Sequence, residues 1–292
     1  MANRDMMILD GSSMLVRAYF ATAYPGRPIR SHNGVFTNAV FGFLNMMFSA
    51  LNQFSPTHLF VAWDVSRDTF RKSLYPEYKG TRGELPAELL AQFDTMQEVL
   101  GAMGIAEYMH EDYEADDIIG SMAEKSKKEG LSVLILTGDK DALQLTSEGI
   151  KVGIMRRGMA DIDVYTPQQL WDEYGLSPVQ MIDVKSLMGD ASDNIPGVPG
   201  IGAKTATRLI REHGSLEKVL ENASSFTGKL RERLETHADL AILCKKLATI
   251  ALDVPLPHGV DDCRLTIRRD AAMSKLESLN LMHSAELIDK FA

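Results

Sequence analysis

The chain of 292 residues contains only two cysteines, Cys244 and Cys263, and neither stands in a CxxC or other metal-binding spacing. This excludes a disulfide framework or a thiolate metal site, and we expect reduced thiols in a cytoplasmic protein. No apolar run approaches the roughly 20 residues that a membrane helix needs, so we predict no membrane partner. The first apolar run, residues 6–9, is also too short for the hydrophobic region of a signal peptide.

Positive charge is scarce relative to negative charge. The chain has 31 Lys and Arg against 40 Asp and Glu, which gives a formal net charge of −9. This total argues against a nucleic-acid partner, because domains that bind nucleic acid tend to be basic. The same total arises, however, if carboxylates are concentrated in one metal-binding hole while basic residues line the surface beside it. The positions of the charges must decide between these interpretations.

The first half of the chain does contain a regular alternation of strand-like and helix-like segments. Strands are predicted at residues 6–10, 58–64, 105–109 and 131–137. Helices are predicted at residues 35–51, 86–103 and 115–129. This alternation implies an α/β fold with a mostly parallel central sheet flanked by helices. In such sheets, ligands bind beyond the carboxyl ends of the strands.

From about residue 177 the pattern changes to short helices separated by Gly/Pro turns. Helices are predicted at 178–187 and 203–212, with the turn 197–202 between them. We therefore expect an α/β core over residues 1–176 and a helical DNA-binding domain over 177–292. The last thirty residues are ambiguous, and we interpret them as one strand and a helix from Ala271 onward.

Three of the predicted strands are followed directly, or after one glycine, by an aspartate: Asp10, Asp64 and Asp139. If those strands are parallel neighbours, the three carboxylates lie at one edge of the sheet. Further carboxylates open a helix or follow nearby in a turn: Glu114, Asp116, Asp117, Asp141, Asp190 and Asp193. Converging carboxylates repel and raise one another's pKa values unless cations neutralise them. Ligand sets made only of oxygen favour Mg²⁺ or Mn²⁺ over zinc.

Most of these acids also have a purely structural explanation. Glu114, Asp116 and Asp117 stand where a helix begins, and negative charge there is favourable to the helix dipole. Asp190 and Asp193 are suited to a turn or cap before a proline. These explanations do not account for three separate strand ends that finish in aspartate, so we favour a metal site.

A basic segment begins three residues after Asp64. Between residues 67 and 82, basic residues alternate with aromatic ones such as Tyr78. The basic residues are Arg67, Arg71, Lys72, Lys79 and Arg82. This composition is typical of a segment that follows a single-stranded backbone and stacks bases, although a solvated loop is the more frequent explanation. A lysine or arginine here is also suited to stabilise charge that develops on a reacting phosphate.

The segment 197–202, Gly-Val-Pro-Gly-Ile-Gly, lies between two predicted helices and is typical of a helix–hairpin–helix. Its glycines are Gly197, Gly200 and Gly202. Glycines let backbone N–H groups approach a phosphate, and the N-terminus of the next helix adds a favourable dipole. Lys204 and Arg208 on that helix are placed for phosphate contacts that do not depend on base sequence.

In combination, these segments resemble the 5′-nuclease (flap endonuclease) superfamily, and most closely the 5′–3′ exonuclease domain at the amino end of bacterial DNA polymerase I. The resemblance extends over nearly the whole chain to about Pro255. Its most specific segments are YEADD at 113–117, TGDKD at 137–141 and GDASDNIPGVPGIG at 189–202. It implies a PIN-like or resolvase-like nuclease core with a helical arch at about 67–100. A helical domain would follow, with its helix–hairpin–helix at about 178–213 and a C-terminal extension.

The resemblance also implies roles for individual residues. The carboxylates would hold two Mg²⁺ ions, with Mn²⁺ as an alternative. The first ion would be held by Asp10, Asp64, Glu114 and Asp116, with Asp117 nearby. The second would be held, partly through water, by Asp139, Asp141, Asp190 and Asp193. Lys79 and Arg82 would act from the arch, and Arg71 and Arg17 would contact phosphate. The hairpin 197–202 would grip duplex DNA, with a potassium ion bound by backbone carbonyls.

The function that the resemblance implies is a structure-specific 5′ nuclease, both 5′–3′ exonuclease and flap endonuclease. Its expected substrates are 5′ flaps, nicked or gapped duplexes and RNA primers, cut by a monomer in replication and repair. Three rivals remain: a catalytically silent DNA-binding protein, a small-molecule phosphohydrolase, and an RNA nuclease of the PIN type. No predicted carboxylate is missing, and the last two rivals do not account for the hairpin. No polymerase domain follows, so we interpret the chain as a stand-alone paralogue or an excised domain.

Overall fold

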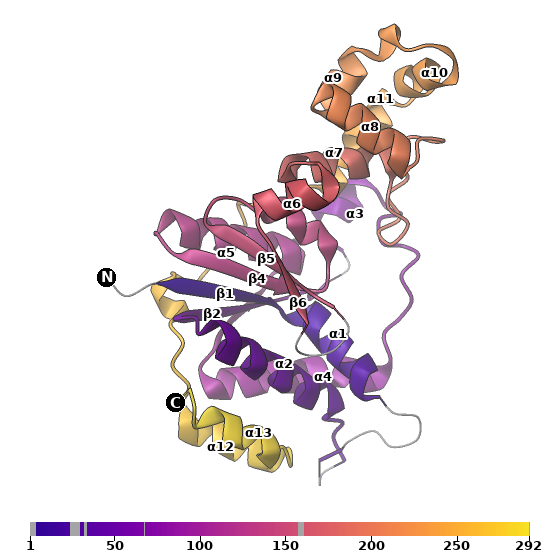
Figure 1. Cartoon of the computed structure of the whole chain (residues 1–292). Coiled ribbons are helices and arrows are strands. Elements are labelled where there is room, and N and C mark those ends of the chain that lie inside the picture. The colour runs from indigo at the N-terminus through magenta and orange to yellow at the C-terminus, as the bar shows by residue number, and fades with distance from the viewer. Residues whose placement is uncertain (1–3, 24–29, 32–33, 67, 157–160, 292) are drawn as a thin grey trace.

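The computed structural model describes residues 4–23, 30–31, 34–66, 68–156 and 161–291, and Figure 1 shows a sheet with helices on both faces and a group of helices beyond one end of it. The strands are β1 (Asp5–Asp10), β2 (His58–Trp63), β3 (Ala106–Met109), β4 (Ser132–Thr137), β5 (Ile150–Met155) and β6 (Ile162–Tyr165). The helices of the first half are α1 (Gly11–Thr22), α2 (Asn38–Phe54), α3 (Phe70–Leu74), α4 (Ala87–Met103), α5 (Ala115–Lys128) and the 3₁₀ helix η1 (Lys140–Leu145). The later helices are α6 (Pro167–Tyr174), α7 (Pro178–Met188), α8 (Ala203–His213), α9 (Leu216–Glu221), η2 (Ala223–Ser225), α10 (Gly228–Thr236), α11 (Ala238–Ala248), η3 (Asp261–Cys263), α12 (Arg269–Ser278) and α13 (Met282–Ile288).

The sheet has the strand order β3-β2-β1-β4-β5-β6. The first five strands of the chain are parallel, and β6 pairs with β5 in the antiparallel direction. The predicted mostly parallel sheet is therefore confirmed, although β5 and β6 were not among the predicted strands. β1 lies between β2 and β4. From β1 the chain first adds β2 and β3 on one side and then β4, β5 and β6 on the other, so the strand order reverses at β1. That is the position where α/β sheets bind ligands.

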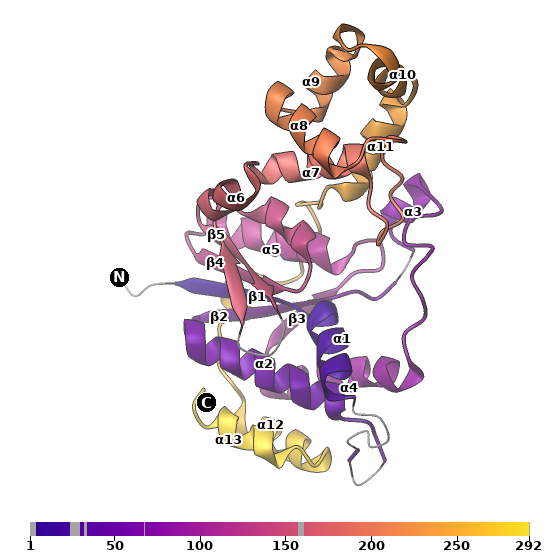
Figure 2. The same cartoon turned by 45° about the vertical axis from the view of Figure 1, so that its right-hand side comes forward.

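Helices bury both faces of the sheet, which explains why its strands are continuous apolar runs rather than alternating ones. Residues 6–9 of β1 are all buried. One face packs against α1, α2 and α4, and the other packs against α5 and η1 (Figure 2). The carboxyl ends of the strands stay uncovered between these layers and the helical domain.

The helical domain has a core of its own. Leu187 of α7, Leu209 and Ile210 of α8, Val219 of α9 and Leu234 of α10 are buried together there. α7 begins with a capping box, in which Ser177 accepts from the backbone of Gln180 and the side chain of Gln180 accepts from Ser177 N–H. α7 also contacts η1, so the first helix of this domain lies against the end of β4.

The C-terminal segment after α11, which the sequence placed with the helical domain, packs against the α/β core. Val254 and Cys263 are buried with the α5 face of the sheet, and Ile267 and Leu276 are buried with the α2 and α4 face. The predicted terminal helix from Ala271 is present as α12 and α13. The predicted strand before it is not, because the described residues there make only isolated or irregular pairings.

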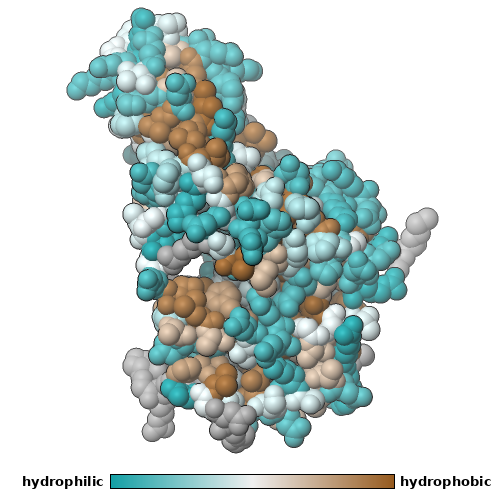
Figure 3. Space-filling view, turned by 180° about the vertical axis from the view of Figure 1, so that it is seen from behind, coloured by the Kyte–Doolittle hydropathy of each residue, from teal (hydrophilic) through white to brown (hydrophobic). Residues whose placement is uncertain are grey.

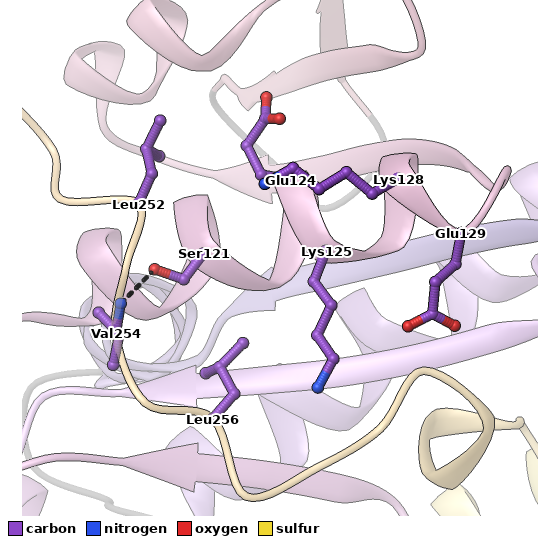
Figure 4. A pocket seen from close by; sticks show the side chains of 8 residues that line it. All are labelled: Ser121, Glu124, Lys125, Lys128, Glu129, Leu252, Val254 and Leu256. Atoms are coloured by element: carbon purple, nitrogen blue, oxygen red, sulfur yellow. Dashed lines mark hydrogen bonds between the residues drawn. The ribbon is translucent and has the colours of Figure 1, made fainter.

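Figure 4 shows how this segment runs along α5, where Ser121 Oγ accepts from the backbone N–H of Val254 at 3.0 Å. A pocket of about 400 Å³ lies between the two, lined by apolar side chains of the segment and by charged side chains of α5. Lys125 closes one side by donating to the carbonyl of His258 at 2.6 Å. Its two acidic side chains, Glu124 and Glu129, line it together with Lys125 and Lys128.

Seen from behind, the surface is mostly hydrophilic, with apolar side chains gathered on the helical domain and on the core below it (Figure 3). Among the described residues, no helix is both long and apolar enough to cross a bilayer. Cys244 and Cys263 are both buried and form no disulfide.

Candidate metal and nucleic-acid site

The three strand-end aspartates meet at one edge of the sheet. Asp10 is the last residue of β1, Asp64 follows β2 directly, and Asp139 follows β4 after one glycine. β1 pairs in parallel with both other strands, with Asp10 beside Ala62 and Leu9 beside Leu136. The carboxyl ends of all three strands therefore open into the same cleft.

The cleft has a volume of about 1050 Å³. Its lining includes five predicted acids, Asp10, Asp64, Glu114, Asp116 and Asp139, and also Asp94 of α4, which was not predicted. Glu114 is the N-cap of α5, and Asp116 lies in the first turn of that helix. The backbone N–H of Ala115 donates to Asp64 Oδ1 at 2.9 Å, which ties the start of α5 to the end of β2.

Asp10 is fixed by two hydrogen bonds. Ser13 N–H donates to one oxygen at 2.9 Å, and the Thr137 hydroxyl donates to the other at 2.6 Å. Burial, followed by the charge of Asp64, raises the pKa of Asp10 to about 7. Burial also raises the pKa of Asp116 well above its usual value, with further contributions from Asp139 and Asp10. Such carboxylates favour a bound cation, because a positive ion relieves both burial and repulsion.

A second carboxylate cluster lies beside the first. One oxygen of each of Asp141, Asp190 and Asp193 lies within 4.8 Å of the others. The two clusters are joined through η1, because Asp141 N–H donates to Asp139 Oδ1 at 2.9 Å. The nine predicted acids therefore divide into five in the cleft, three in the second cluster, and Asp117.

Cations of the chain itself pair with the second cluster. Lys185 Nζ contacts both Asp141 and Asp190, and Arg82 contacts Asp193 at 2.6 Å. Burial raises the pKa of Asp141 to about 6 despite Lys185. Burial acts in the same direction on Asp190, but hydrogen bonds from Lys185 and Ser192 outweigh it and lower the pKa of Asp190 to about 2.

Arg71 and Asp117 form a buried pair outside the cleft. Arg71 is 2% exposed and Asp117 is fully buried. Two guanidinium nitrogens of Arg71 donate to the two Asp117 oxygens at 2.6 and 2.7 Å. The remaining donors reach the carbonyls of Leu247 and Thr249, at the end of α11. This geometry leaves neither side chain free for the phosphate or metal contact that the resemblance implied.

The other basic residues after β2 also face carboxylates. Lys79 Nζ pairs with Glu114 at 2.7 Å, and the Tyr78 hydroxyl donates to Glu114 at 3.1 Å. Lys79 adopts a left-handed backbone conformation with φ 53°. Its backbone N–H donates a hydrogen bond to the carbonyl of Asp193, which stabilises this conformation. Tyr78 is 4% exposed, so it does not present a ring for base stacking. Within this segment, α3 is the only regular helix among the described residues before α4.

The remaining predicted contacts of this region are more peripheral. Arg17 lines the cleft and donates to the carbonyl of Arg156 at 2.6 Å. Lys72 pairs with Asp68 on the surface at 2.8 Å. Arg67 lies outside the described residues.

The hairpin needs its first two glycines for its shape. Gly197 and Gly200 have φ of 64° and 81°, in the left-handed region that favours glycine. A Cβ on Gly197 would lie 2.3 Å from the backbone nitrogen of Gly189. Gly202, the N-cap of α8, has open space around it. Lys204 and Arg208 on α8 are exposed to solvent, with Arg208 paired to Glu212.

Comparison with known proteins identifies the family. Residues 5–175 match the 5′–3′ exonuclease N-terminal resolvase-like domain, and residues 176–271 match the 5′–3′ exonuclease C-terminal SAM fold. The chain belongs to the 5′–3′ exonuclease family. The resemblance and fold class inferred from the sequence are thereby confirmed.

Curated proteins similar to this exonuclease-family chain include bacterial DNA polymerases. It is 45% identical over 260 residues to DNA polymerase I of Bacillus caldotenax, covering 89% of this chain and 29% of that protein. It is 42% identical over 260 residues to DNA polymerase I of Mycobacterium leprae, covering 89% of this chain and 28% of that protein. The chain thus spans less than a third of the length of these relatives.

Solved structures share the exonuclease fold at lower identity. The T5 5′-exonuclease with bound divalent metal ions (zinc) has a TM-score of 0.69 at 20% identity, with 99% of this chain and 97% of the other covered. The catalytic core of Rad2 in complex with DNA substrate has a TM-score of 0.59 at 18% identity, with 99% and 93% covered. At these identities the likeness shows a common fold.

Sequence reasoning missed several residues of this exonuclease site. Ser13 and Thr137 hold Asp10, and Lys185 joins two acids of the second cluster. The only local signal was the position of Lys185 itself, a basic residue in the last turn of α7 just before the turn that contains Asp190. Its partner Asp141 is 44 residues away in the chain, which no local pattern connects.

Proposed function

We propose that this chain is a structure-specific 5′ nuclease that hydrolyses DNA phosphodiesters with divalent metal ions. The observation that carries the proposal is the convergence of five predicted carboxylates in one cleft that Lys79 and Arg82 also line. An all-oxygen donor set with two carboxyl pKa values raised by burial and repulsion suits Mg²⁺ or Mn²⁺. Membership of the 5′–3′ exonuclease family supports the same activity.

We assign the first metal position to Asp10, Asp64, Glu114, Asp116 and Asp139, and the second to Asp141, Asp190 and Asp193. The resemblance placed Asp139 at the second ion; we move it to the first because it lines the cleft. Bound there, divalent ions would lower the pKa of an attacking water and stabilise the leaving oxygen. Thr137 and Ser13 orient Asp10 for this task. Lys79 holds Glu114 in place and lies at the cleft, where its ammonium is suited to stabilise charge on the phosphate.

Arg71 and Asp117 are better explained as positioning residues than as phosphate and metal ligands. Asp117 Oδ2 accepts both from Arg71 and from the N–H of Glu114, so the pair fixes the start of α5. Its other oxygen accepts from Ala251 N–H, beyond the end of α11. The pair thereby joins the basic segment, the helix that carries Glu114 and Asp116, and the helical domain.

We propose that the exposed face of α8 and the hairpin bind the phosphate backbone of duplex DNA without reading its sequence. Lys204 and Arg208 are exposed there, and Gly202 leaves the N-terminus of α8 open. A potassium ion on the hairpin carbonyls is part of this proposal. The carbonyl of Gly200 already accepts from Arg233 at 2.9 Å, so the ion would use other carbonyls or displace that contact.

The finer proposal is a monomer that cuts 5′ flaps, nicked or gapped duplexes and RNA primers. One gel tests it: labelled 5′-flap, 3′-flap and single-stranded DNA and RNA are incubated with Mg²⁺ or with EDTA. We expect cleavage of the 5′-flap in Mg²⁺ alone, and little cleavage of the 3′-flap. Binding of the 5′-flap without cleavage would support a silent DNA-binding protein, and preferred cleavage of single-stranded RNA would support a PIN-type nuclease.

A further inference from the structure

Lys185 occupies an unusual place for a lysine. It lies in the last turn of α7 and is only 9% exposed. Its ammonium contacts an oxygen of Asp141, in η1, and an oxygen of Asp190, in the turn after α7. One buried cation thus joins two acids that come from different parts of the chain.

The turn that holds Asp190 is otherwise rigid. Asp190 and Ile195 exchange two backbone hydrogen bonds of 2.8 Å. The second oxygen of Asp190 accepts from the backbone and hydroxyl of Ser192, at 2.7 and 2.6 Å. Lys185 therefore contacts the one oxygen of Asp190 that Ser192 does not occupy, the oxygen best placed for a ligand.

The first cluster differs in this respect. Asp10, Asp64, Asp116 and Asp139 make no salt bridge with any residue of the described part of the chain. In the second cluster, all three acids have a protein cation, from Lys185 or from Arg82. The fifth acid of the first cluster, Glu114, pairs with Lys79 and Arg71 at 2.7 and 3.4 Å. A divalent ion entering the first cluster therefore meets four carboxylates without a salt bridge, whereas one entering the second cluster meets a cation in contact with every acid.

We propose that Lys185 is the resident counter-ion of the second carboxylate cluster and must withdraw from Asp141 and Asp190 when a second divalent ion binds there. Lys185 then has two effects: it keeps the cluster assembled without the ion, and it makes the second ion bind more weakly than the first. It is a positioning residue in this role. The inference rests on the proposed metal sites, but it concerns ion binding and does not require DNA cleavage.

The test measures binding of Mn²⁺ to the DNA-free chain by electron paramagnetic resonance of the free ion. Wild type should bind one ion tightly and a second more weakly. In Lys185→Met the second ion should bind at least about tenfold more tightly, because a unit positive charge next to a divalent ion is removed. Lys185→Arg, which retains the charge, should keep two distinct affinities.

Lys245 offers a matched control. Its ammonium also contacts two carboxylates, Asp183 and Glu217 at 2.6 Å each, but within the helical domain. Lys245→Met should leave both Mn²⁺ affinities unchanged. In EDTA, both Met variants should melt below wild type, and Mn²⁺ should restore only Lys185→Met toward the wild-type melting temperature. Lys185→Gln repeats the measurement with a polar neutral side chain if the Met variant does not fold.

Unchanged or weaker binding of the second ion in both neutral variants would overturn the proposal and leave Lys185 as a simple tether. Equal loss of melting temperature in EDTA and in Mn²⁺ would do the same. A failed proposal on function looks different, because wild type would then cut no 5′-flap substrate while the shift in Mn²⁺ affinity could still be observed.

Discussion

The two groups of basic residues in this chain differ in the partners of their side chains. Arg71, Lys79 and Arg82, after β2, form the inward group, because they pair with Asp117, Glu114 and Asp193 around the carboxylate site. Arg71 is buried, Lys79 is partly buried and Arg82 is exposed. Lys204 and Arg208, on α8, are exposed to solvent. A basic composition marks both segments in the same way. In the outward group, however, Lys204 makes no salt bridge with the described residues, and the pair of Arg208 with Glu212 is exposed, so little is lost when either residue meets a phosphate backbone. The inward group pairs with acids of the proposed metal sites, so we expect it to act on the chemistry through them.

The largest effect on cleavage should come from changing a carboxylate of the cleft that Lys79 and Arg82 also line. Asp116→Asn should reduce cleavage of a 5′-flap by roughly 10³-fold or more, since loss of even an outer-shell partner of a metal ligand costs ~10–100-fold. The same change should raise the melting temperature in EDTA, because burial and repulsion raise the pKa of Asp116 and make its charge unfavourable without metal.

Cleavage and melting temperature of Asp116→Asn should thus change in opposite directions. Asp270→Asn is the matched control, since Asp270 is fully exposed on α12. Wild-type cleavage by Asp116→Asn in Mg²⁺ would remove Asp116 from the metal site. DNA binding measured in Ca²⁺ should remain close to wild type.

The next largest effect concerns Arg71. Arg71→Met should lower the free energy of unfolding by ~3–5 kcal/mol, because it leaves Asp117 buried and unpaired. Arg208→Met removes the exposed pair with Glu212 and should change stability by less than about 1 kcal/mol. Urea unfolding measures both.

Arg71→Met therefore separates the two roles considered for this residue. A variant that unfolds like wild type but binds DNA weakly would restore Arg71 as a phosphate contact. A variant that is unstable, yet binds DNA normally when folded at low temperature, supports the positioning role.

Lys79 should affect turnover more than binding. Lys79→Met should slow single-turnover cleavage by ~10²-fold, which is the usual cost of removing one charged group that stabilises a transition state. Its effect on DNA affinity should be less than about threefold, because Lys79 pairs with Glu114 rather than standing in solvent. A loss of affinity with an unchanged rate at saturating DNA would place Lys79 with the outward group instead.

The contrast between the two groups also shows what the sequence could and could not predict. Asp10, Asp64 and Asp139 were predictable because an apolar run and the acid after it are adjacent in the chain, and parallel strands end at one edge. The Arg71–Asp117 pair was not, because 46 residues separate its members and burial is decided by packing. The helical tendency of 271–292 was local and visible, but its docking on α2 and α4 depends on an apolar surface built by residues far away.

The smallest effect should come from the outward group. Lys204→Ala should weaken binding of duplex DNA only a fewfold and should reduce the slope of log affinity against log salt by about 1, the value for one lost phosphate contact. The rate at saturating DNA should stay at the wild-type value, since Lys204 lies on α8 and does not line the carboxylate cleft. Fluorescence anisotropy at several salt concentrations gives the slope, with Lys151→Ala, at an exposed position of β5, as the control for charge alone. An unchanged salt slope in Lys204→Ala would mean that α8 does not face the DNA, and the distinction between inward and outward basic residues would then lose its functional meaning.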